Sequence, residues 1–405
     1  MTQIFRKLGP GLLFAGAAIG VSHLVQSTRA GADYGFSLIW ALLLVNLFKY
    51  PFFQYGPRYA MATGESLLDG YKKLGKSVLV IYFILTLATM FTIQTAVTIV
   101  TAGLAANLFG ITTNVVIWSI IITCVCFLML LIGKYRLLDR LIKYIIIILT
   151  FSTLIAVVLA TNHMEDGLSF KQILPEGALG IAFLVAFMGW MPAPLDISIW
   201  HSLWALEKKK TVADYTIKNS LFDFNIGYVG TVVLGICFIV LGALVMFNSG
   251  ETFDNGAAKF ASQLISLYTK NLGEGTYIVI ALAAFTTMFS TTITTLDASP
   301  RAMAHTSKLL FQTSVKKGFF LWMILLVLGT CAIFLFFLSE MKLLVDIATI
   351  LSFITAPFYA IVNYTLIISK HTPKQWRPNK YMRVLSWSGI LFLIGFSSWY
   401  LIKLL

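Results

Sequence analysis

The sequence predicts an all-α integral membrane protein with about eleven transmembrane helices, arranged as a five-plus-five inverted repeat. Three observations lead to this fold class. Of the 405 residues, 58% are hydrophobic and only 12% are charged, whereas a soluble domain is roughly half apolar and about a quarter charged. Apolar runs recur along the chain, and basic residues gather between them. This composition excludes an ordinary cytosolic enzyme and a disordered chain.

Each predicted span is an apolar run long enough to cross about 30 Å of hydrocarbon. The spans lie at about 9–32, 36–60, 77–109, 113–133, 139–161, 178–206, 219–248, 275–299, 317–338, 341–369 and 384–404. Several are longer than required, which permits a tilt or a break. We expect one transmembrane domain over 1–405, with repeat one at about 9–161, repeat two at about 178–369 and an additional helix at 384–404.

The loops predict the orientation. Most of the 30 Lys and Arg residues fall on one side if the N-terminus is cytoplasmic and the C-terminus is outside, as the positive-inside rule requires. The net charge of +13 therefore indicates loops that face an anionic cytoplasmic leaflet of the cell membrane, with no nucleic-acid partner. The longest outer loops are 162–177 and 249–274, and the second contains 257–272, which we expect to form an amphipathic helix on the membrane surface.

Spans one and six are interrupted. Gly20, Ser22 and His23 lie in the middle of span one, and Pro192 and Pro194 lie in the middle of span six. Two prolines so close together remove two backbone donors and break a helix. Breaks in the first helix of each half are the sequence feature that best indicates a transporter's binding site, because lipid cannot satisfy the freed backbone groups. The alternative is a small-residue packing face in span one and a simple kink in span six.

Asp196 and His23 are the candidate metal ligands of this site. A carboxylate at bilayer depth costs roughly 2.5–3.5 kcal/mol, so Asp196 is a functional candidate by default; the alternative is that it only caps the second half of span six. Imidazole binds softer divalent metals and carries protons, so His23 is a ligand or a proton carrier, or else a hydrogen-bonded packing residue.

The sequence resembles the NRAMP metal-ion transporters, which have the LeuT-type inverted-repeat fold. The resemblance is carried by Gly9-Pro10-Gly11, by 30–35, by Asn107–Ile111, by His201-Ser202 and by Pro357-Phe358. It implies the fold and an alternating-access cycle. Two functional motifs depart from the family pattern. Gly20-Val21-Ser22-His23 stands where the family has Asp-Pro-Gly-Asn, and Met191-Pro192-Ala193-Pro194 stands where it has Met-Pro-His.

Further candidate residues follow from the breaks and the resemblance. We expect a substrate or ion site made from Gly20, Ser22, His23, Met191, Ala193, Asp196 and Thr349. His201, Asp297 and Arg301 are candidates for protonation or gating. The alternative for His201 is a helix–helix hydrogen bond, and the alternative for Asp297 and Arg301 is a structural i,i+4 salt bridge. Asp346 lies four residues after Lys342, so local pairing is the simpler interpretation of that acid.

The predicted function is secondary-active transport of an inorganic divalent metal cation of the Mg, Mn and Fe class by alternating access. The alternative is transport of a small organic solute such as an amino acid, possibly coupled to a cation. The expected partners are this solute and the lipid bilayer. We expect neither an enzyme nor a cofactor, because the catalytic and nucleotide-binding signatures GxSxG, HExxH and GxxxxGK[ST] do not occur.

Overall fold

The computed structural model describes residues 8–132, 135–161, 169–212, 214–247, 253–336 and 341–404, and within these ranges it contains helices and loops but no β-strand. A helix lies at each of the eleven predicted ranges. The all-α fold is therefore confirmed. Residues 162–168 and 249–252 of the two predicted outer loops lie outside the described residues.

The first half of the chain begins with a broken helix. Its parts are α2 (Pro10–Ala18), the π-helix η1 (Ser22–Ser27) and α3 (Thr28–Tyr34), with a bend of 46° between α2 and the rest. It continues with α4 (Ile39–Thr63), the short α5 (Leu67–Leu74), α6 (Lys76–Phe109), α7 (Val115–Ile132) and α8 (Tyr135–Thr161).

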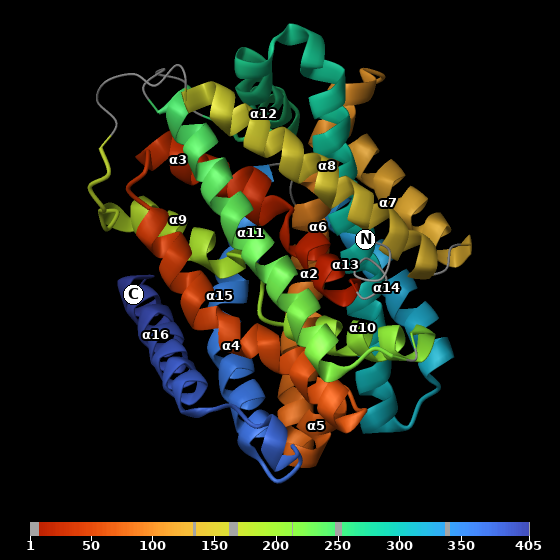
Figure 1. Cartoon of the computed structure of the whole chain (residues 1–405). Helices are drawn as coiled ribbons and strands as arrows, with labels where there is room; N and C mark the ends of the chain where they lie inside the picture. Colours follow the sequence, from red (N-terminus) through yellow and green to blue (C-terminus); the bar gives the residue numbers. More distant parts are fainter. Residues whose placement is uncertain are drawn as a thin grey trace.

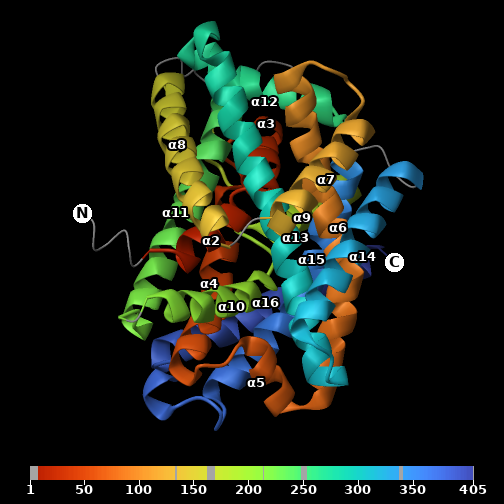
Figure 2. The same cartoon turned by 90° about the vertical axis from the view of Figure 1, so that its right-hand side faces the viewer.

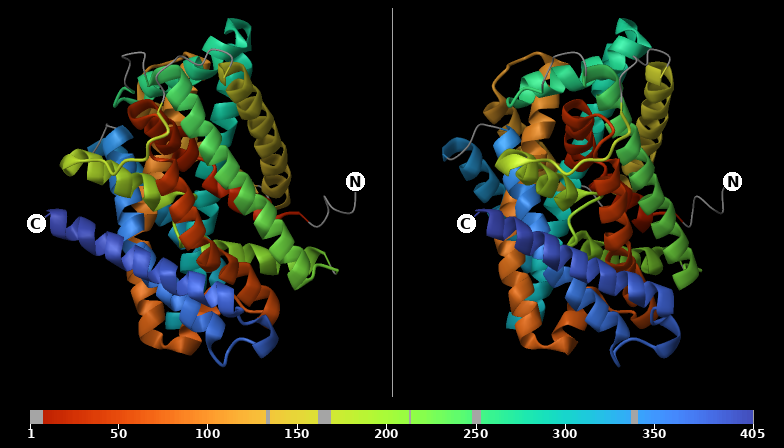
Figure 3. Two further views of the ribbon diagram at one scale, coloured as in Figure 1. Left: turned by 60° about the vertical axis from the view of Figure 1, so that its left-hand side comes forward. Right: turned by 90° about the vertical axis from the view of Figure 1, so that its left-hand side faces the viewer.

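The second half also begins with a broken helix. Its two parts are α9 (Gly177–Trp190) and α10 (Ile197–Thr211). It continues with α11 (Ile217–Met246), α12 (Ala257–Leu272), η2 (Glu274–Thr276), α13 (Tyr277–Phe311), α14 (Val315–Phe336), α15 (Met341–Ile368), η3 (Lys374–Trp376) and α16 (Lys380–Leu404). Figure 3 shows α16 running along one flank of the bundle, where it packs on α4 and α15.

The surface and the helix lengths are those of a multi-pass membrane protein. Among the described residues, seven single helices are long and apolar enough to cross a bilayer, and the bent first span makes an eighth. Large apolar side chains such as Leu128, Phe151 and Leu328 are more than half exposed on α7, α8 and α14. An apolar exterior of this extent requires lipid as its solvent.

The two ends of the bundle are marked by its short helices. In Figures 1 and 2, α12 lies at one end and α5 at the other, and we call these the α12 end and the α5 end. The predicted helix 257–272 is confirmed as α12, but its surroundings differ from the prediction. Its apolar side chains, including Phe260, Leu264 and Tyr268, are buried against α6, α8 and α13. The apolar face that suggested membrane binding covers the bundle instead.

Candidate functional site

The breaks of the two interrupted helices meet in the middle of the bundle. The Ser22 hydroxyl at the start of η1 lies 2.6 Å from the Ala18 carbonyl oxygen and 3.2 Å from the Pro192 carbonyl oxygen. Gly20 allows this approach, since a Cβ there would lie 2.8 Å from the Thr291 hydroxyl of α13. The first break is therefore in direct contact with both the second break and α13.

A small cavity of about 20 Å³ lies between the breaks, with room for about one water-sized particle. Ala193 and the indole rings of Trp190 and Trp200 form part of its wall, and the hydroxyl-bearing residues Ser22 and Thr291 also line it. The wall is mainly apolar, with a few hydroxyl groups as its polar part.

Both ring nitrogens of His23 contact protein oxygens. Nδ1 lies 2.7 Å from the Ser22 hydroxyl and 3.1 Å from the Ala18 carbonyl oxygen, and Nε2 lies 2.9 Å from the Thr231 carbonyl oxygen of α11. A carbonyl oxygen only accepts, so Nε2 carries a proton and donates it. The ring is fully buried, and in this conformation it uses its nitrogens to join the first span to α11.

Asp196 occupies the N-cap position of α10, but its side chain makes no capping hydrogen bond. It is 5% exposed, and its Oδ1 atom has no hydrogen-bond partner. Three buried phenols lie within range of its charge, those of Tyr71, Tyr82 and Tyr359 on α5, α6 and α15. A buried carboxylate oxygen without a donor is costly, so Asp196 is suited to receive a proton or a cation.

Lys49 is a buried cation that sequence reasoning did not select. It comes from the middle of α4, is fully buried, and points its Nζ atom at the end of α9. Nζ lies 2.8 Å from the Met188 carbonyl oxygen, 2.7 Å from that of Gly189 and 3.4 Å from that of Ala193. A lysine in the middle of a predicted span was the signal that could have identified it.

Met191 and Thr349 lie on either side of the second break. Met191 is fully buried, and its Sδ atom and the His23 ring both lie beside Gly235 of α11. The Thr349 hydroxyl donates within α15, to the carbonyl oxygens of Val345 and Asp346 at 2.8 and 3.0 Å. The Thr349 carbonyl oxygen would be 2.1 Å from a Cβ at position 189, so the bare glycine lets α15 contact α9 closely.

The three gating candidates have separate surroundings. His201 is fully buried, neither ring nitrogen has a hydrogen-bond partner, and the ring stacks on Phe14 with centroids 5.8 Å apart. Asp297 and Arg301 form the i,i+4 salt bridge on α13, with Nη2 2.5 Å from Oδ1 and Nε 3.1 Å from Oδ2. Arg301 also lies over the Phe319 ring.

An ion pair joins the first and tenth spans near the α12 end. The Arg29 Nη1 atom lies 3.0 Å from Asp346 Oδ1 and 3.0 Å from Gln26 Oε1, and the Gln26 amide donates to the same Asp346 oxygen at 3.2 Å. Local pairing of Asp346 with Lys342 is therefore wrong. The bend in span one turns Arg29 toward α15, and this contact could not be predicted from the spacing of residues in the sequence.

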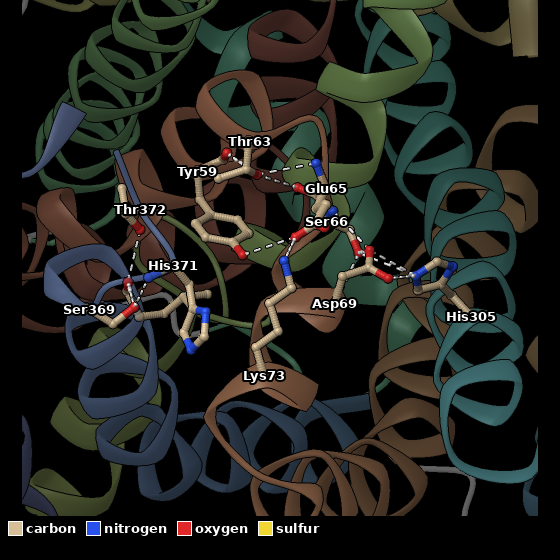
Figure 4. Close-up of polar contacts among 11 residues, drawn as sticks. Tyr59, Thr63, Glu65, Ser66, Asp69, Lys73, His305, Ser369, His371 and Thr372 are labelled. Carbon is tan, nitrogen blue, oxygen red and sulfur yellow. Dashed lines mark hydrogen bonds and ion pairs between the residues drawn. The ribbon is translucent and has the colours of Figure 1, made fainter. Parts of the chain in front are cut away.

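A cavity of about 710 Å³ opens at the α5 end, between α5, α10 and α13. Figure 4 draws the contacts of four residues that line it, Glu65, Ser66, Asp69 and His305. His305 Nε2 lies 3.1 Å from both carboxylate oxygens of Asp69, which also accepts from the Ser66 backbone amide at 3.0 Å. Lys73 pairs with Glu65 at 2.5 Å. Burial raises the pKa of Asp69, but the bonds and charge of His305 and the bonds from Ser66 outweigh it and lower the pKa to about 2.

The predicted site residues thus form two groups. Gly20, Ser22, His23, Met191 and Ala193 lie at the junction of the breaks, whereas Asp196 faces the phenols of α5, α6 and α15. Within the described ranges, no three His, Cys, Asp or Glu side chains gather closely enough to hold a metal ion together. A cation bound between the two groups would have to use Asp196, hydroxyl groups and carbonyl oxygens.

Comparison with known proteins identifies relatives of the whole chain. A family model described as "Natural resistance-associated macrophage protein-like" (Nramp) matches residues 11–403. "Uncharacterized protein PM0681" of Pasteurella multocida is 36% identical over 399 residues, which cover 97% of this chain and 91% of that protein. The "Divalent metal cation transporter MntH" of Staphylococcus saprophyticus is 27% identical over 258 residues, covering 61% of this chain and 57% of that protein.

A solved structure has the same fold. The crystal structure of a manganese transporter from Eremococcus coleocola superposes with a TM-score of 0.73 at 14% identity, covering 98% of this chain and 86% of that one.

Proposed function

Because the chain belongs to the Nramp family, we propose that it is a secondary transporter that moves a small solute by alternating access, with the solute bound between the breaks of the first and sixth spans. The observation that carries this proposal is the contact of the Ser22 hydroxyl with the Pro192 carbonyl oxygen, 3.2 Å apart. Two half-helix ends whose backbone groups lie outside the helical hydrogen-bond pattern meet there, as expected for a solute site at membrane depth.

The cavities support access from the α5 end in this conformation. The larger cavity opens beside α10 and α13 at that end, whereas Arg29 and Asp346 join α3 to α15 near the α12 end. With the orientation predicted from the basic residues, the α5 end faces the cytoplasm of the cell. In the proposed cycle, spans one, two, six and seven rock against the others, which breaks the Arg29–Asp346 pair when the α12 end opens.

A divalent metal cation of the Mg, Mn and Fe class is the first candidate substrate. The MntH relatives are divalent metal cation transporters by name, and the buried Oδ1 of Asp196 has no partner. A carboxylate with hydroxyl and carbonyl oxygens suits a hard divalent ion. In the proposed site, Asp196 is the charged ligand, the Ser22 hydroxyl and the Ala193 carbonyl supply further oxygens, and His201 or Asp196 exchanges protons.

A small organic solute, such as an amino acid, is the second candidate, and a specific observation favours it. Carbonyl oxygens freed at the two breaks already accept hydrogen bonds, that of Ala18 from the Ser22 hydroxyl and those of Met188 and Gly189 from Lys49. They are therefore occupied before any metal ion arrives. Indole rings also form part of the wall of the small cavity, and indole rings pack favourably on apolar groups.

One experiment separates the two candidates. Purified protein is screened by thermal shift against Mg²⁺, Mn²⁺, Fe²⁺ and the amino acids, because a ligand that binds only the folded state raises Tm. Hits are tested for saturable uptake into proteoliposomes. Mn²⁺ uptake that is lost in Asp196→Ala supports the metal. Stabilisation and uptake of an amino acid without any metal effect supports the organic solute. Absence of saturable uptake for every hit would contradict the transporter.

A further inference from the structure

We propose that the ammonium group of Lys49 is a tethered cation that fills a carbonyl-lined monovalent cation site at the break of the sixth span, so that this break needs no free ion. The site consists of the carbonyl oxygens of Met188, Gly189 and Ala193. This assignment concerns the break itself and does not depend on which solute is transported.

The donor and acceptor numbers at Lys49 agree. A lysine ammonium has three N–H donors, and Nζ has three carbonyl oxygens around it at 2.8, 2.7 and 3.4 Å. The side chain is fully buried. The three contacts of Nζ are all with carbonyl oxygens. The positive charge is therefore balanced by carbonyl dipoles, which is also how carbonyl-lined sites hold alkali ions.

The break in span six explains why these oxygens are available. Met188 and Gly189 belong to the last turn of α9, whose carbonyl groups have no intrahelical donors. Ala193 lies in the unwound segment before α10. The end of a half-helix also carries a partial negative charge, which attracts a cation. Without Lys49, three buried carbonyl oxygens would lack donors at one point, and a small cation would be the simplest replacement.

The side chain also links two spans. Lys49 lies in α4, and its three partners lie in α9 and the following break. A plain structural link would require the bulk and reach of this side chain, whereas the proposed site requires its charge. These two requirements can be separated by substitution.

The test measures Tm of detergent-purified full-length protein in choline, sodium or n-propylammonium chloride at equal ionic strength. Lys49→Ala removes the atoms that n-propylammonium can replace, and choline is too large for the site. For Lys49→Ala we expect a Tm about 5–10 °C below wild type in choline, because buried partners are left unsatisfied. At least about half of this loss should return in n-propylammonium or sodium. Wild-type Tm should be the same in all three salts.

Two further variants complete the test. Leu42→Ala empties a fully buried apolar position on the same helix, and its loss of Tm should not respond to either cation. Lys49→Met keeps the bulk of the side chain and removes its charge, and this variant should be less stable than wild type. It also provides a test of the charge if the Lys49→Ala protein does not accumulate. A wild-type Tm for Lys49→Met, or a Tm of Lys49→Ala that neither cation raises, would overturn the proposal. These measurements contain no transported solute. Either result therefore leaves the proposed transport function untouched.

Discussion

The hydroxyl oxygen of Ser22 lies 3.2 Å from the carbonyl oxygen of Pro192, although 170 positions separate the two residues. In a continuous helix the Pro192 carbonyl oxygen would accept an intrahelical hydrogen bond, but Pro192 lies between α9 and α10, and Ser22 directly follows the bend of the first span. This contact places the two discontinuities at the same depth. A movement of one broken span would therefore be transmitted to the other span through Ser22.

We predict that Ser22→Ala impairs transport more than stability. The loss of one buried hydrogen bond costs about 1 kcal/mol, which corresponds to a fall in Tm of about 2 °C. Uptake of the solute identified by thermal shift should fall at least about tenfold, because the breaks are no longer joined. The matched control is Ser27→Ala, whose hydroxyl donates only within the same helix, to the Ser22 carbonyl oxygen. Equal loss of uptake in both variants would contradict the special role of Ser22.

Asp196→Asn should separate activity from stability. The carboxylate is buried and its Oδ1 atom has no partner, so removal of the charge relieves a cost and should leave Tm unchanged or raise it by a few degrees. Uptake should be abolished in the same variant. Asp297→Asn is the control, since that carboxylate is paired with Arg301 and its loss should lower Tm. A large fall in Tm for Asp196→Asn would show that Asp196 is structural.

The Arg29–Asp346 pair should act as a closure near the α12 end. Arg29→Met and Asp346→Asn each remove it, and both should increase the labelling of a cysteine placed at Gln26 by a thiol reagent added from that side. Because Asp346 is partly exposed, the coupling energy should be about 1 kcal/mol in a double-mutant cycle. Additive effects of the two substitutions would mean that the pair does not contribute to closure.

The Asp69–His305 contact predicts a pH dependence of stability. The pKa of Asp69 is lowered from 3.8 to about 2, so the folded state binds its proton less readily than the unfolded state. The stabilisation is present at pH 5 and is lost as the pH falls through 3.8 toward 2. The difference in Tm between wild type and Asp69→Asn should therefore shrink over this range, and His305→Gln should reduce it at pH 5. A difference that does not change with pH would contradict this account.

The sequence was sufficient to predict the architecture. Long apolar runs allow few structures in lipid, so helices appear at all eleven predicted ranges, and the breaks beside Gly20 and at Pro192 follow from local backbone chemistry. The end of α13 was less predictable. The helix continues through Pro300 to Phe311, about a dozen residues beyond the predicted span. Packing against neighbouring helices stabilises this extension, and such packing cannot be read from local sequence.

The partners of the site residues were not predictable from spacing. Lys49 and the carbonyl oxygens of α9 and of the following break are 139 to 144 positions apart, and their contact depends on how α4 packs against the second break. His23 has the chemistry of a ligand, but its ring meets Thr231 of α11. Residue type indicated which groups were unusual, whereas three-dimensional packing decided what each group contacts.

The most direct test is a cryo-EM map of the full chain in lipid nanodiscs, with the solute identified by thermal shift present. We predict that the first and sixth spans are unwound around Ser22 and Pro192 and that solute density lies between them, next to Asp196. Continuous helices at these positions, or solute density bound elsewhere while the junction stays closed to it, would contradict the account.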